Sequence, residues 1–406
     1  MITILIAGAG ASGMCAAITA ARQGAHVILL EKNDIAGKKI SMTGNGRCNI
    51  TNEAMSASCY NLSAQSKMEG WLQRFGVAKT LEFMKSLGVV TQSEEGYIYP
   101  ISGQAVTVQN AMIDEVVRLG VEYITGQQLK KITPVDDGGF EVKTTGGLYK
   151  ADKVIIATGG LSGPKSTMST GDSYYIAKSL GMNVTKTYPA LVALLSDDKD
   201  LPSKYGVRMM AGIRIKEIED LYEYGEVQIT SKGISGIPVL QLSGRVAQYM
   251  ADNNGAVTAF LDFFPTYSDD DFANMKKDII EVSSGKTYIQ VLDGISNHLI
   301  GLMILSRLGI KEDTVIDANS IDNLERVIDN YRNVRINIVA TSDYASSQVT
   351  KGGVDLNDLT DDLESVHTPG VYVVGELTDV DGRCGGYNLQ WAFTSGYIAG
   401  MAAAGR

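Results

Sequence analysis

The strongest constraint on the fold of this chain lies in its first 31 residues, where a short apolar run breaks into a glycine-rich turn. Residues 2–7 read Ile-Thr-Ile-Leu-Ile-Ala, and the turn that follows has the spacing Gly8-x-Gly10-x-x-Gly13. An alanine-rich stretch and a second apolar run come next, and that run ends at Glu31. This order predicts strand, turn, helix, strand and acid, which is the fingerprint of a dinucleotide-binding βαβ unit.

Each part of the fingerprint has its own physical role. Gly8 allows a tight turn, Gly10 lets the backbone approach a pyrophosphate, and Gly13 lets the helix pack closely on the sheet. The first turn of the helix presents free N–H groups and a partial positive charge to the phosphates. Glu31 follows Gly13 by 18 residues, where a carboxylate can accept hydrogen bonds from an adenosine ribose. We therefore expect a nucleotide site here, and the alternative is a tight turn that binds nothing.

Composition and charge restrict the classes of protein to which the chain can belong. The sequence has 406 residues, 44% hydrophobic and 20% charged, which is ordinary for a globular protein of two or three domains. Its net charge of −10 argues against a nucleic-acid partner, because a protein that neutralises phosphates needs a basic face. The four cysteines include no C-x-x-C pair, and the three histidines are not grouped with cysteines or acids. We expect reduced thiols and no metal site.

Two long uncharged stretches, residues 1–21 and 387–405, could be mistaken for membrane spans. Glycines divide the first into strand and helix, and it has no basic leader region. The second is rich in small and polar residues and fits a buried helix packed on a sheet. We therefore expect a cytoplasmic protein with a small-molecule substrate and no membrane partner, while its oligomeric state stays open.

The distribution of glycine motifs divides the chain into outer and middle parts. In the outer part, periodic apolar residues predict a helix over residues 64–88. We expect residues 1–189 and 342–406 to build one discontinuous cofactor domain. Residues 190–341, where glycine motifs are missing and strand-like runs mix with helical ones, are expected to be an inserted substrate domain, with a helical part around 269–310.

A second glycine-rich segment, residues 37–52, follows the fingerprint. It reads Gly-Lys-Lys-x-x-x-Thr-Gly-Asn-Gly-Arg-Cys-Asn-x-Thr-Asn. Glycines that let backbone amides approach, together with cations that offset phosphate charge, suit an anionic and planar ligand. The alternatives are a mobile surface loop, an Arg47 that only braces its own loop, and lysines that are plain solvated charges.

Two further strand ends would meet the fingerprint at one edge of a doubly wound sheet. One apolar run ends in Ala-Thr-Gly-Gly at 157–160, where the adenosine half of a cofactor would pass. The other ends in Gly375-Glu376, which places a carboxylate beside ribityl hydroxyls, and the next helix begins at Tyr387-Asn388. The positive end of that helix would face the flavin N1–C2=O edge. One fingerprint together with a Gly-acid pair favours non-covalent FAD over NAD as the resident cofactor.

The motifs at residues 43–49, 188–191 and 375–390 resemble those of the bacterial aminoacetone oxidase family of FAD-binding proteins. The resemblance spans the whole chain. It implies an α/β architecture, with a glutathione-reductase-like FAD-binding Rossmann domain and an inserted β-barrel-like plus helical domain. Family members are NAD(P)/FAD-dependent oxidoreductases, among them dehydro-bile-acid reductases, and are assigned both amine oxidation and enone reduction. The resemblance therefore leaves the substrate open.

The middle of the chain has no second Gly-x-Gly-x-x-Gly motif, so we expect NAD(P)H to dock transiently as an electron donor. The first hypothesis is NAD(P)H-driven reduction of an activated double bond in a hydrophobic small molecule of the dehydro-bile-acid or enone type. Tyr387 and Tyr188 are the candidate proton donors. The alternatives are an aminoacetone-type amine oxidase that uses O₂ and, from another class, a flavin-holding sensor or RNA-modification scaffold.

The candidate cofactor-binding residues come from the segments described above, and Tyr387 and Asn388 could alternatively serve only as helix caps and packing residues. The full set is Gly8, Gly10, Ser12, Gly13, Glu31, Lys32, Lys39, Thr43, Gly44, Gly46, Arg47, Cys48, Asn49, Ala157, Thr158, Gly159, Gly375, Glu376, Gly386, Tyr387, Asn388 and Leu389.

Overall fold

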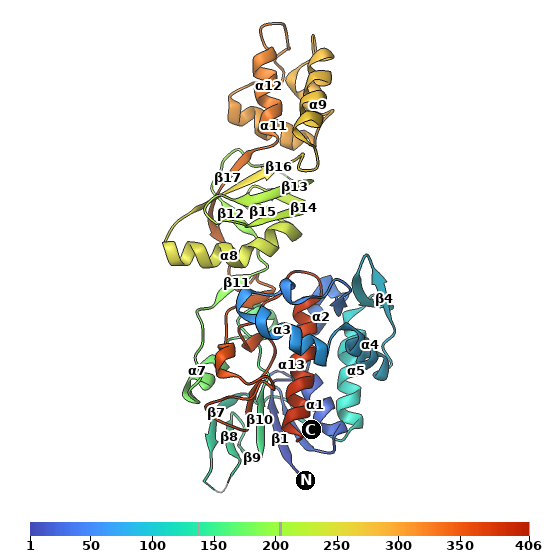
Figure 1. Ribbon diagram of the computed structural model, residues 1–406, viewed down its shortest axis with the longest axis vertical. Coiled ribbons are helices and arrows are strands. Elements are labelled where there is room, and N and C mark those ends of the chain that lie inside the picture. The colour runs from blue at the N-terminus through green and yellow to red at the C-terminus, as the bar shows by residue number, and fades with distance from the viewer. Residues whose placement is uncertain (137, 203–204, 406) are drawn as a thin grey trace. The chain divides into compact units, whose positions relative to one another are not determined.

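The computed structural model describes residues 1–136, 138–202 and 205–405 (Figure 1). The chain forms two compact units. The first combines Met1–Tyr188 with Tyr344–Arg406, and the second is Pro189–Asp343. The N-terminal and C-terminal segments thus share one unit, and the middle of the chain builds the other.

A five-stranded parallel sheet in the order β19-β10-β1-β2-β6 is the centre of the first unit. β1 lies between β10 and β2. The chain extends the sheet from β1 first toward β2 and β6, and later toward β10 and β19 on the other side. The carboxyl end of β1 is therefore the topological switch point of the sheet. Four of its strands are nearly all apolar and buried, as expected for a sheet covered on both faces, whereas the edge strand β6 has no buried residue. The strands are β1 (Thr3–Ala7), β2 (His26–Leu30), β6 (Glu122–Ile124), β10 (Lys153–Ile156) and β19 (Val371–Val373).

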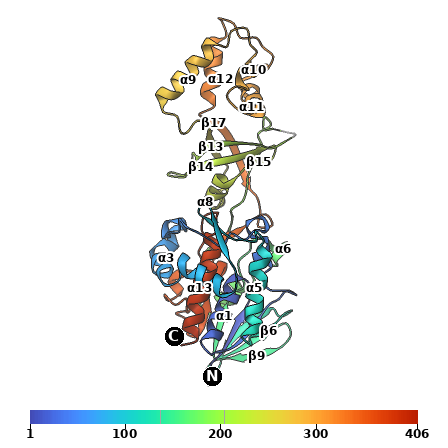
Figure 2. The same cartoon turned by 90° about the vertical axis from the view of Figure 1, so that its right-hand side faces the viewer.

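Two helices from opposite ends of the chain, α1 (Ala11–Arg22) and α13 (Tyr387–Ala403), run side by side in this unit (Figures 1 and 2). A Cβ on Gly396 would lie 2.3 Å from the Ser12 carbonyl oxygen, and one on Gly400 would lie 2.7 Å from that of Ala16. The small residues of the last uncharged stretch therefore serve close helix packing. Among the described residues, no helix is both long enough and apolar enough to cross a bilayer.

The prediction of one helix over residues 64–88 is wrong in one respect, because the segment forms two helices. They are α3 (Leu62–Arg74) and α4 (Val77–Ser86). Between them Gly76 has an extended backbone, and a Cβ there would lie 2.5 Å from the Leu72 carbonyl oxygen. The apolar periodicity continues across the break, which is why the pattern alone did not reveal it. The loop expected over residues 36–52 also contains regular elements: the short helices α2 (Lys38–Met42) and η1 (Thr43–Gly46) and the strand β3 (Thr51–Asn52).

The remaining elements of the first unit surround the central sheet. They include two three-stranded antiparallel sheets, β3-β5-β4 and β7-β8-β9, and β11 pairs with β18. The bounds are α2 (Lys38–Met42), η1 (Thr43–Gly46), β3 (Thr51–Asn52), η2 (Ala57–Cys59), α3 (Leu62–Arg74), α4 (Val77–Ser86), β4 (Thr91–Glu94), β5 (Tyr97–Pro100), α5 (Ala105–Arg118), β7 (Leu129–Pro134), β8 (Phe140–Thr144), β9 (Leu148–Ala151), α6 (Pro164–Thr167), α7 (Asp172–Ser179), β11 (Tyr188–Ala190), β18 (Val349–Lys351), η3 (Leu356–Asp358) and η4 (Gly375–Leu377).

The second unit consists of a closed barrel in the order β12-β15-β14-β13-β16-β17 and five helices among its described residues. One long helix, α8, has no counterpart among the sequence expectations; it begins after Gly236, whose φ is +99°, and carries Pro238 in its first turn. The bounds are β12 (Leu194–Ser196), β13 (Val207–Ile215), β14 (Tyr222–Thr230), β15 (Gly233–Ser235), α8 (Ile237–Asn253), β16 (Val257–Asp262), α9 (Asp269–Glu281), α10 (Tyr288–Leu292), α11 (His298–Leu308), α12 (Ile321–Asn330) and β17 (Val334–Thr341).

Candidate cofactor and active site

The three glycines of the fingerprint meet different surroundings. Gly8 has a φ of +104°, and a Cβ there would lie 2.5 Å from the carbonyl oxygen of Ala157. A Cβ on Gly13 would lie 1.8 Å from the carbonyl oxygen of Gly8. Around Gly10, by contrast, no described protein atom lies within 4 Å of a Cβ position. Gly8 and Gly13 are therefore required by packing within the protein, whereas the space at Gly10 is open to a ligand.

The acid at the end of β2 is built into the fingerprint turn. The buried Glu31 carboxylate accepts hydrogen bonds from the backbone N–H of Ala9 (2.9 Å) and from both the backbone and the side chain of Asn33 (2.9 and 2.7 Å). Its neighbour Lys32 points elsewhere and donates to the Thr170 hydroxyl at 2.9 Å. A carboxylate can accept about four hydrogen bonds, so Glu31 retains one lone pair, on Oε2, for a ribose hydroxyl.

The end of β19 contacts the start of α1. Gly375 has a φ of +67°, and a Cβ there would lie 2.5 Å from the hydroxyl oxygen of Ser12. The Gly375 backbone N–H also donates to the Ser395 hydroxyl of α13 at 2.9 Å. The fingerprint and the Gly-acid pair, which are far apart in the sequence, are thus adjacent in the fold.

Glu376 and Lys39 form an ion pair in a small polar cluster. The Ser162 hydroxyl is hydrogen-bonded to both of them, and the backbone N–H of Thr350 donates to Glu376 Oε1 at 3.0 Å. The Glu376 side chain is 17% exposed and the Lys39 side chain 33%. Sequence reasoning placed both charged residues at the cofactor but missed Ser162 and Thr350. Ser162 lies two residues beyond the Gly159-Gly160 strand end, whereas no motif marks Thr350.

The segment at residues 43–49 has an unusual backbone. Gly44, Asn45, Gly46 and Cys48 all have positive φ, between +54° and +82°. The Thr43 hydroxyl donates to the carbonyl oxygen of Ile40 at 2.7 Å. Cys48 is buried, and this burial raises the pKa of its thiol to about 12. The segment therefore has a defined backbone conformation, and the buried thiol of Cys48 is protonated and unreactive.

Arg47 makes two contacts with the β4–β5 hairpin. Its guanidinium pairs with Glu94 at 2.5 Å and lies 4.2 Å from the centre of the Tyr99 ring. The alternative left open by the sequence was that Arg47 braces its own loop, whereas these two contacts join that loop to the neighbouring hairpin. Glu94 uses only Nη2 of the guanidinium, so other N–H donors of Arg47 remain for a phosphate, and its cofactor role stays a prediction.

Two polar atoms in the candidate set are buried and have no hydrogen-bond partner among the described residues: Thr158 Oγ1 and Asn49 Oδ1. Buried polar atoms in folded proteins are nearly always paired, with protein groups or with a bound molecule. Thr158 follows β10 and its Cα lies 2.9 Å from a Cβ position on Gly8, while Asn49 Oδ1 lies 2.8 Å from one on Gly386. The two atoms therefore lie at the fingerprint and at the start of α13, where a bound dinucleotide could supply partners.

The first turn of α13 adjoins the segment at residues 43–49. Gly386 precedes the helix with a φ of +94°, and no described side chain caps the helix end. The free N–H groups and the partial positive charge at the start of α13 are thus available to an anionic group. The Asn388 side chain instead holds the preceding loop, since it accepts from the Gly382 N–H at 2.8 Å and donates to the Gly382 carbonyl at 3.0 Å. The next residue, Leu389, is half-buried.

Both candidate proton donors are buried tyrosines. Tyr387 is 7% exposed, and its ring meets the edge of the Tyr60 ring at a centroid distance of 6.4 Å. Burial, and secondarily the neighbouring Cys59, raise the pKa of Tyr387 to about 12. Tyr188 is also 7% exposed, and the Lys186 ammonium lies 5.3 Å from the centre of its ring. Their catalytic roles stay predictions.

Two acids between β19 and α13, Asp379 and Asp381, have raised pKa values. The carboxylate of Asp381 lies 3.6 Å from the Lys351 ammonium, and both side chains are 17% exposed. Burial raises the pKa of Asp381 to about 6, an effect that Lys351 opposes and Asp379 reinforces. Burial also raises the pKa of Asp379. The sequence drew attention to this segment but not to these carboxyls, whose environment depends on β18.

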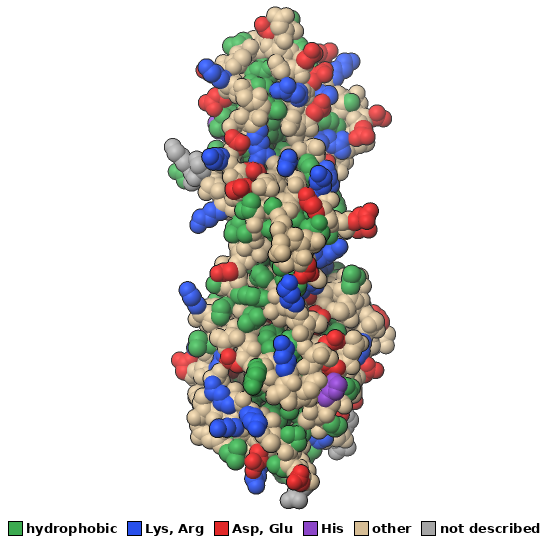
Figure 3. All heavy atoms as spheres, turned by 90° about the vertical axis from the view of Figure 1, so that its left-hand side faces the viewer, with side chains coloured by type: hydrophobic (Ala, Val, Ile, Leu, Met, Phe, Trp, Pro, Cys, Tyr) green, Lys and Arg blue, Asp and Glu red, His purple; other side chains and the backbone are tan. Residues whose placement is uncertain are grey.

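Surface charge differs between the two units. The second unit has 15 Lys and Arg residues against 23 Asp and Glu, whereas the first has 21 against 23. On the face in Figure 3, basic and acidic side chains are interspersed, and the basic ones visible there form no continuous stripe. Among the described residues, no group of three or more His, Cys, Asp and Glu side chains is arranged to hold a metal ion.

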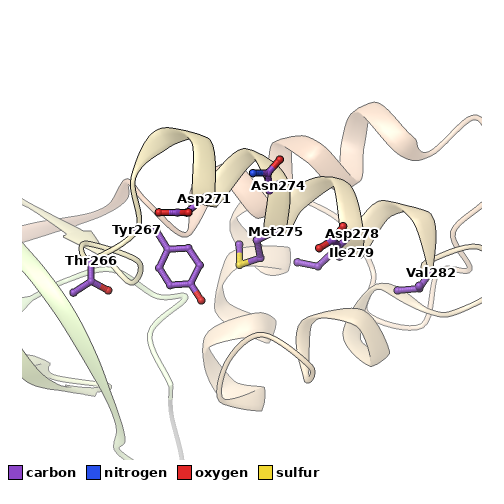
Figure 4. A pocket seen from close by; sticks show the side chains of 8 residues that line it. All are labelled: Thr266, Tyr267, Asp271, Asn274, Met275, Asp278, Ile279 and Val282. Carbon is purple, nitrogen blue, oxygen red and sulfur yellow. The ribbon is translucent and has the colours of Figure 1, made fainter.

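One open hollow lies away from the candidate residues. It runs along one side of α9 in the second unit, where Tyr267 and Met275 project beside the helix (Figure 4). Asp271 and Asp278 make its border acidic. It shares no residue with the candidate cofactor set.

Residues 2–402 match the family described as the HI0933-like protein Rossmann domain. Because the match covers almost the entire chain, the protein belongs to this family of FAD-binding Rossmann oxidoreductases. The family membership and the parallel sheet with its separate barrel confirm the recognition and the fold class expected from the sequence.

Two relatives cover essentially the whole chain. It is 38% identical over 414 aligned residues to the 3-dehydro-bile acid delta(4,6)-reductase of Clostridium scindens, with 100% of both chains covered. It is 28% identical to the ribosomal RNA dihydrouridine synthase of Escherichia coli, over 97% of this chain and 96% of the relative.

Two solved structures share the fold. The 3-ketosteroid-delta4-(5alpha)-dehydrogenase of Rhodococcus jostii RHA1 superposes with a TM-score of 0.54 at 14% identity, covering 99% of this chain and 96% of the other. The 3-ketosteroid delta1-dehydrogenase of Sterolibacterium denitrificans gives 0.53 at 13% identity and full coverage of both chains. At these identities the likeness concerns the arrangement of the elements.

Proposed function

We propose that this protein is an FAD-dependent reductase that uses NAD(P)H to saturate a carbon–carbon double bond conjugated to a carbonyl in a hydrophobic, steroid-like molecule. The observation that carries the proposal is the 38% identity, over the full length of both chains, to a reductase acting on 3-dehydro bile acids. The chemistry of the site is compatible with it, since the fingerprint, the Gly-acid pair and the middle of α13 contact one another.

The residues of the first unit fit the cofactor. The open space at Gly10 and the N–H groups at the start of α1 suit a pyrophosphate, and Glu31 suits the adenosine ribose. Thr158 Oγ1 and Asn49 Oδ1 have buried hydrogen-bonding capacity that a dinucleotide would use. Bound FAD would supply hydride transfer, and the protein would supply orientation, exclusion of water and a proton.

The protein's own contribution to the reaction includes a proton for the carbon next to the carbonyl. Tyr387, whose pKa is about 12, stays protonated at neutral pH and could hold such a proton. Residues 190–341 are proposed to select the substrate, because an inserted unit can vary without disturbing the cofactor residues.

Anaerobic spectroscopy tests the proposal. Purified protein saturated with FAD is mixed separately with NADH, NADPH and a panel of amines, and the flavin absorbance is followed. We expect at least one nicotinamide to bleach the flavin, and a 3-dehydro bile acid with double bonds at positions 4 and 6 to restore the colour. Bleaching by an amine alone, with neither nicotinamide active, would replace the reductase with an amine oxidase that passes electrons to O₂.

A second candidate is reduction of uridine in ribosomal RNA, which the 28% identity to a dihydrouridine synthase favours. Dihydrouridine formation saturates the C5=C6 bond of uracil, which is conjugated to a carbonyl, so the same chemistry would serve either substrate. The charge of the second unit, with 23 acids against 15 basic residues, weighs against a polyanionic substrate. Reoxidation of the reduced flavin by a ribosomal RNA transcript, but not by the bile acid, would favour this candidate.

A further inference from the structure

The two acids between β19 and α13 differ in how their oxygens are used. Both Asp379 oxygens are acceptors, with the Asn61 amide at 3.3 Å from one and the Ser63 hydroxyl at 3.4 Å from the other. Asp381 Oδ1 is buried and has no hydrogen-bond partner among the described residues, although the Lys351 ammonium lies 3.6 Å away. Asp381 therefore has an oxygen that can hold a proton without breaking an existing hydrogen bond.

The loop that carries Asp381 is fixed on both sides. The backbone N–H of Asp381 donates to Asn61 Oδ1 at 3.1 Å, and the Asp381 carbonyl accepts from the Asn61 N–H at 2.9 Å. The next residue, Gly382, exchanges two hydrogen bonds with Asn388 in the first turn of α13. Gly382 also lies against Tyr387, since a Cβ there would stand 2.9 Å from that of Tyr387. Asp381 is thus held beside the helix end assigned to the flavin ring.

We propose that Asp381 is the proton reservoir of the reaction: its carboxyl supplies the proton that accompanies the hydride when the conjugated double bond is saturated. The assignment rests on the proposed function. One carbon of the double bond receives the hydride from the reduced cofactor. The other receives a proton as the Asp381 O–H bond breaks, directly or through Tyr387, and water then returns a proton to the carboxylate. The hydride contributes two electrons and one hydrogen and the carboxyl contributes the second hydrogen, so one double bond becomes a single bond.

The charged groups that face Asp381 act on its proton in opposite directions. Lys351, from β18, favours the carboxylate, whereas Asp379, from the same loop, favours the protonated acid. Burial is the largest effect, and together with these two charges it raises the pKa of Asp381 to about 6. This value is close to neutrality and well above the pKa of an ordinary aspartate. A general acid works best when its pKa lies near the operating pH.

The test compares Asp381→Asn, Asp379→Asn, Lys351→Met and the exposed control Asp362→Asn, which is 52% exposed and pairs with Arg74. Two readouts are used: the infrared carbonyl stretch of a protonated carboxyl as a function of pH, measured without substrate, and single-turnover reduction of the dienone bile acid. We expect the wild type to show a carboxyl band that titrates near pH 6 and is missing in Asp381→Asn. Bile-acid reduction should fall at least about a hundredfold in Asp381→Asn, while flavin reduction by nicotinamide changes less than about threefold.

The neighbouring variants supply a signature that a purely structural role would not give. Removing the Asp379 charge should lower the pH of the inflection in both readouts, and removing the Lys351 charge should raise it. Asp381→Glu should recover part of the lost rate. Equal rates and equal pH profiles in wild type and Asp381→Asn would overturn the assignment while leaving the proposed function intact. A wild type that does not reduce the bile acid at all would overturn both.

Discussion

The hydroxyl oxygen of Ser12 lies 2.5 Å from the position that a Cβ on Gly375 would occupy. This contact joins the start of the first helix to the end of the last strand of the central sheet. The fingerprint and the Gly-acid pair become one region because of it, and only glycine leaves room for the Ser12 side chain.

Gly375→Ala should therefore lower the unfolding free energy by more than the backbone strain of a positive φ would alone. Gly120 is a matched control, since its φ of +71° resembles the +67° of Gly375 but no atom lies within 4 Å of its Cβ position. We expect Gly120→Ala to lose about 1 kcal/mol of unfolding free energy. Gly375→Ala should lose about 1–3 kcal/mol more, together with bound FAD. Urea unfolding and flavin absorbance measure the two effects, and equal losses in both variants would contradict the contact.

The glycines of the fingerprint should separate binding from stability. Gly10 has an ordinary φ of −78° and open space around it, so Gly10→Ala should change the unfolding free energy by less than about 1 kcal/mol. We expect its FAD affinity to fall at least about tenfold, a loss of about 1.4 kcal/mol. Gly13→Ala, whose Cβ would meet the Gly8 carbonyl, should instead destabilise the fold by more than about 3 kcal/mol. Unchanged FAD affinity in Gly10→Ala would remove the pyrophosphate from this turn.

Asp381 should impose a pH dependence on stability. Its pKa of about 6 in the folded chain exceeds the value of about 3.9 expected in the unfolded chain. The folded state therefore binds the proton more tightly, so this carboxyl lowers the unfolding free energy as pH rises from about 4 to 6.5, by about 2–3 kcal/mol in total. Asp381→Asn should lose this slope and be the more stable protein above pH 7. Parallel stability–pH curves for the two proteins would contradict the raised pKa.

The ion pair between Lys39 and Glu376 should be energetically coupled. A double-mutant cycle with Lys39→Met and Glu376→Gln should give about 1–2 kcal/mol of coupling, because the pair is largely buried and shares Ser162. The control is the pair of Lys38 with Asp34, whose acid is 85% exposed, and there we expect less than about 0.5 kcal/mol. Chemical denaturation of the four proteins in each cycle measures the coupling.

The thiols should divide into two classes. Cys15 and Cys48 are buried, and burial raises the pKa of each to about 12, so neither forms a thiolate near neutrality. Cys59 and Cys384 are partly exposed. Titration with a thiol-specific disulfide reagent at pH 8 should label at most two of the four cysteines in the native protein and all four in denaturant. Rapid labelling of Cys48 in the folded protein would contradict the packing of its segment.

Features that depend on local spacing could be predicted from the order of residues alone. Gly8, Gly10 and Gly13 fall within a few residues of one another, and their spacing is set by the turn that they build, so the βαβ unit and the nucleotide site could be predicted. The small residues of the last helix indicated close packing, but the sequence predicted a sheet as the partner, whereas Gly396 packs against helix α1. The extra break at Gly76 was not, because apolar periodicity continues through a kink.

Contacts between residues far apart in the sequence could not be predicted in this way, because they depend on how the chain folds. Ser162 and Thr350 join Lys39 and Glu376 only because separate loops converge at the carboxyl edge of the sheet. The raised pKa of Asp381 depends on burial and on Lys351 from another strand. A pattern of residue types along the chain encodes backbone conformation and the face that is buried. Desolvation and charge pairing instead depend on three-dimensional distances between segments, and these exist only once the chain has folded.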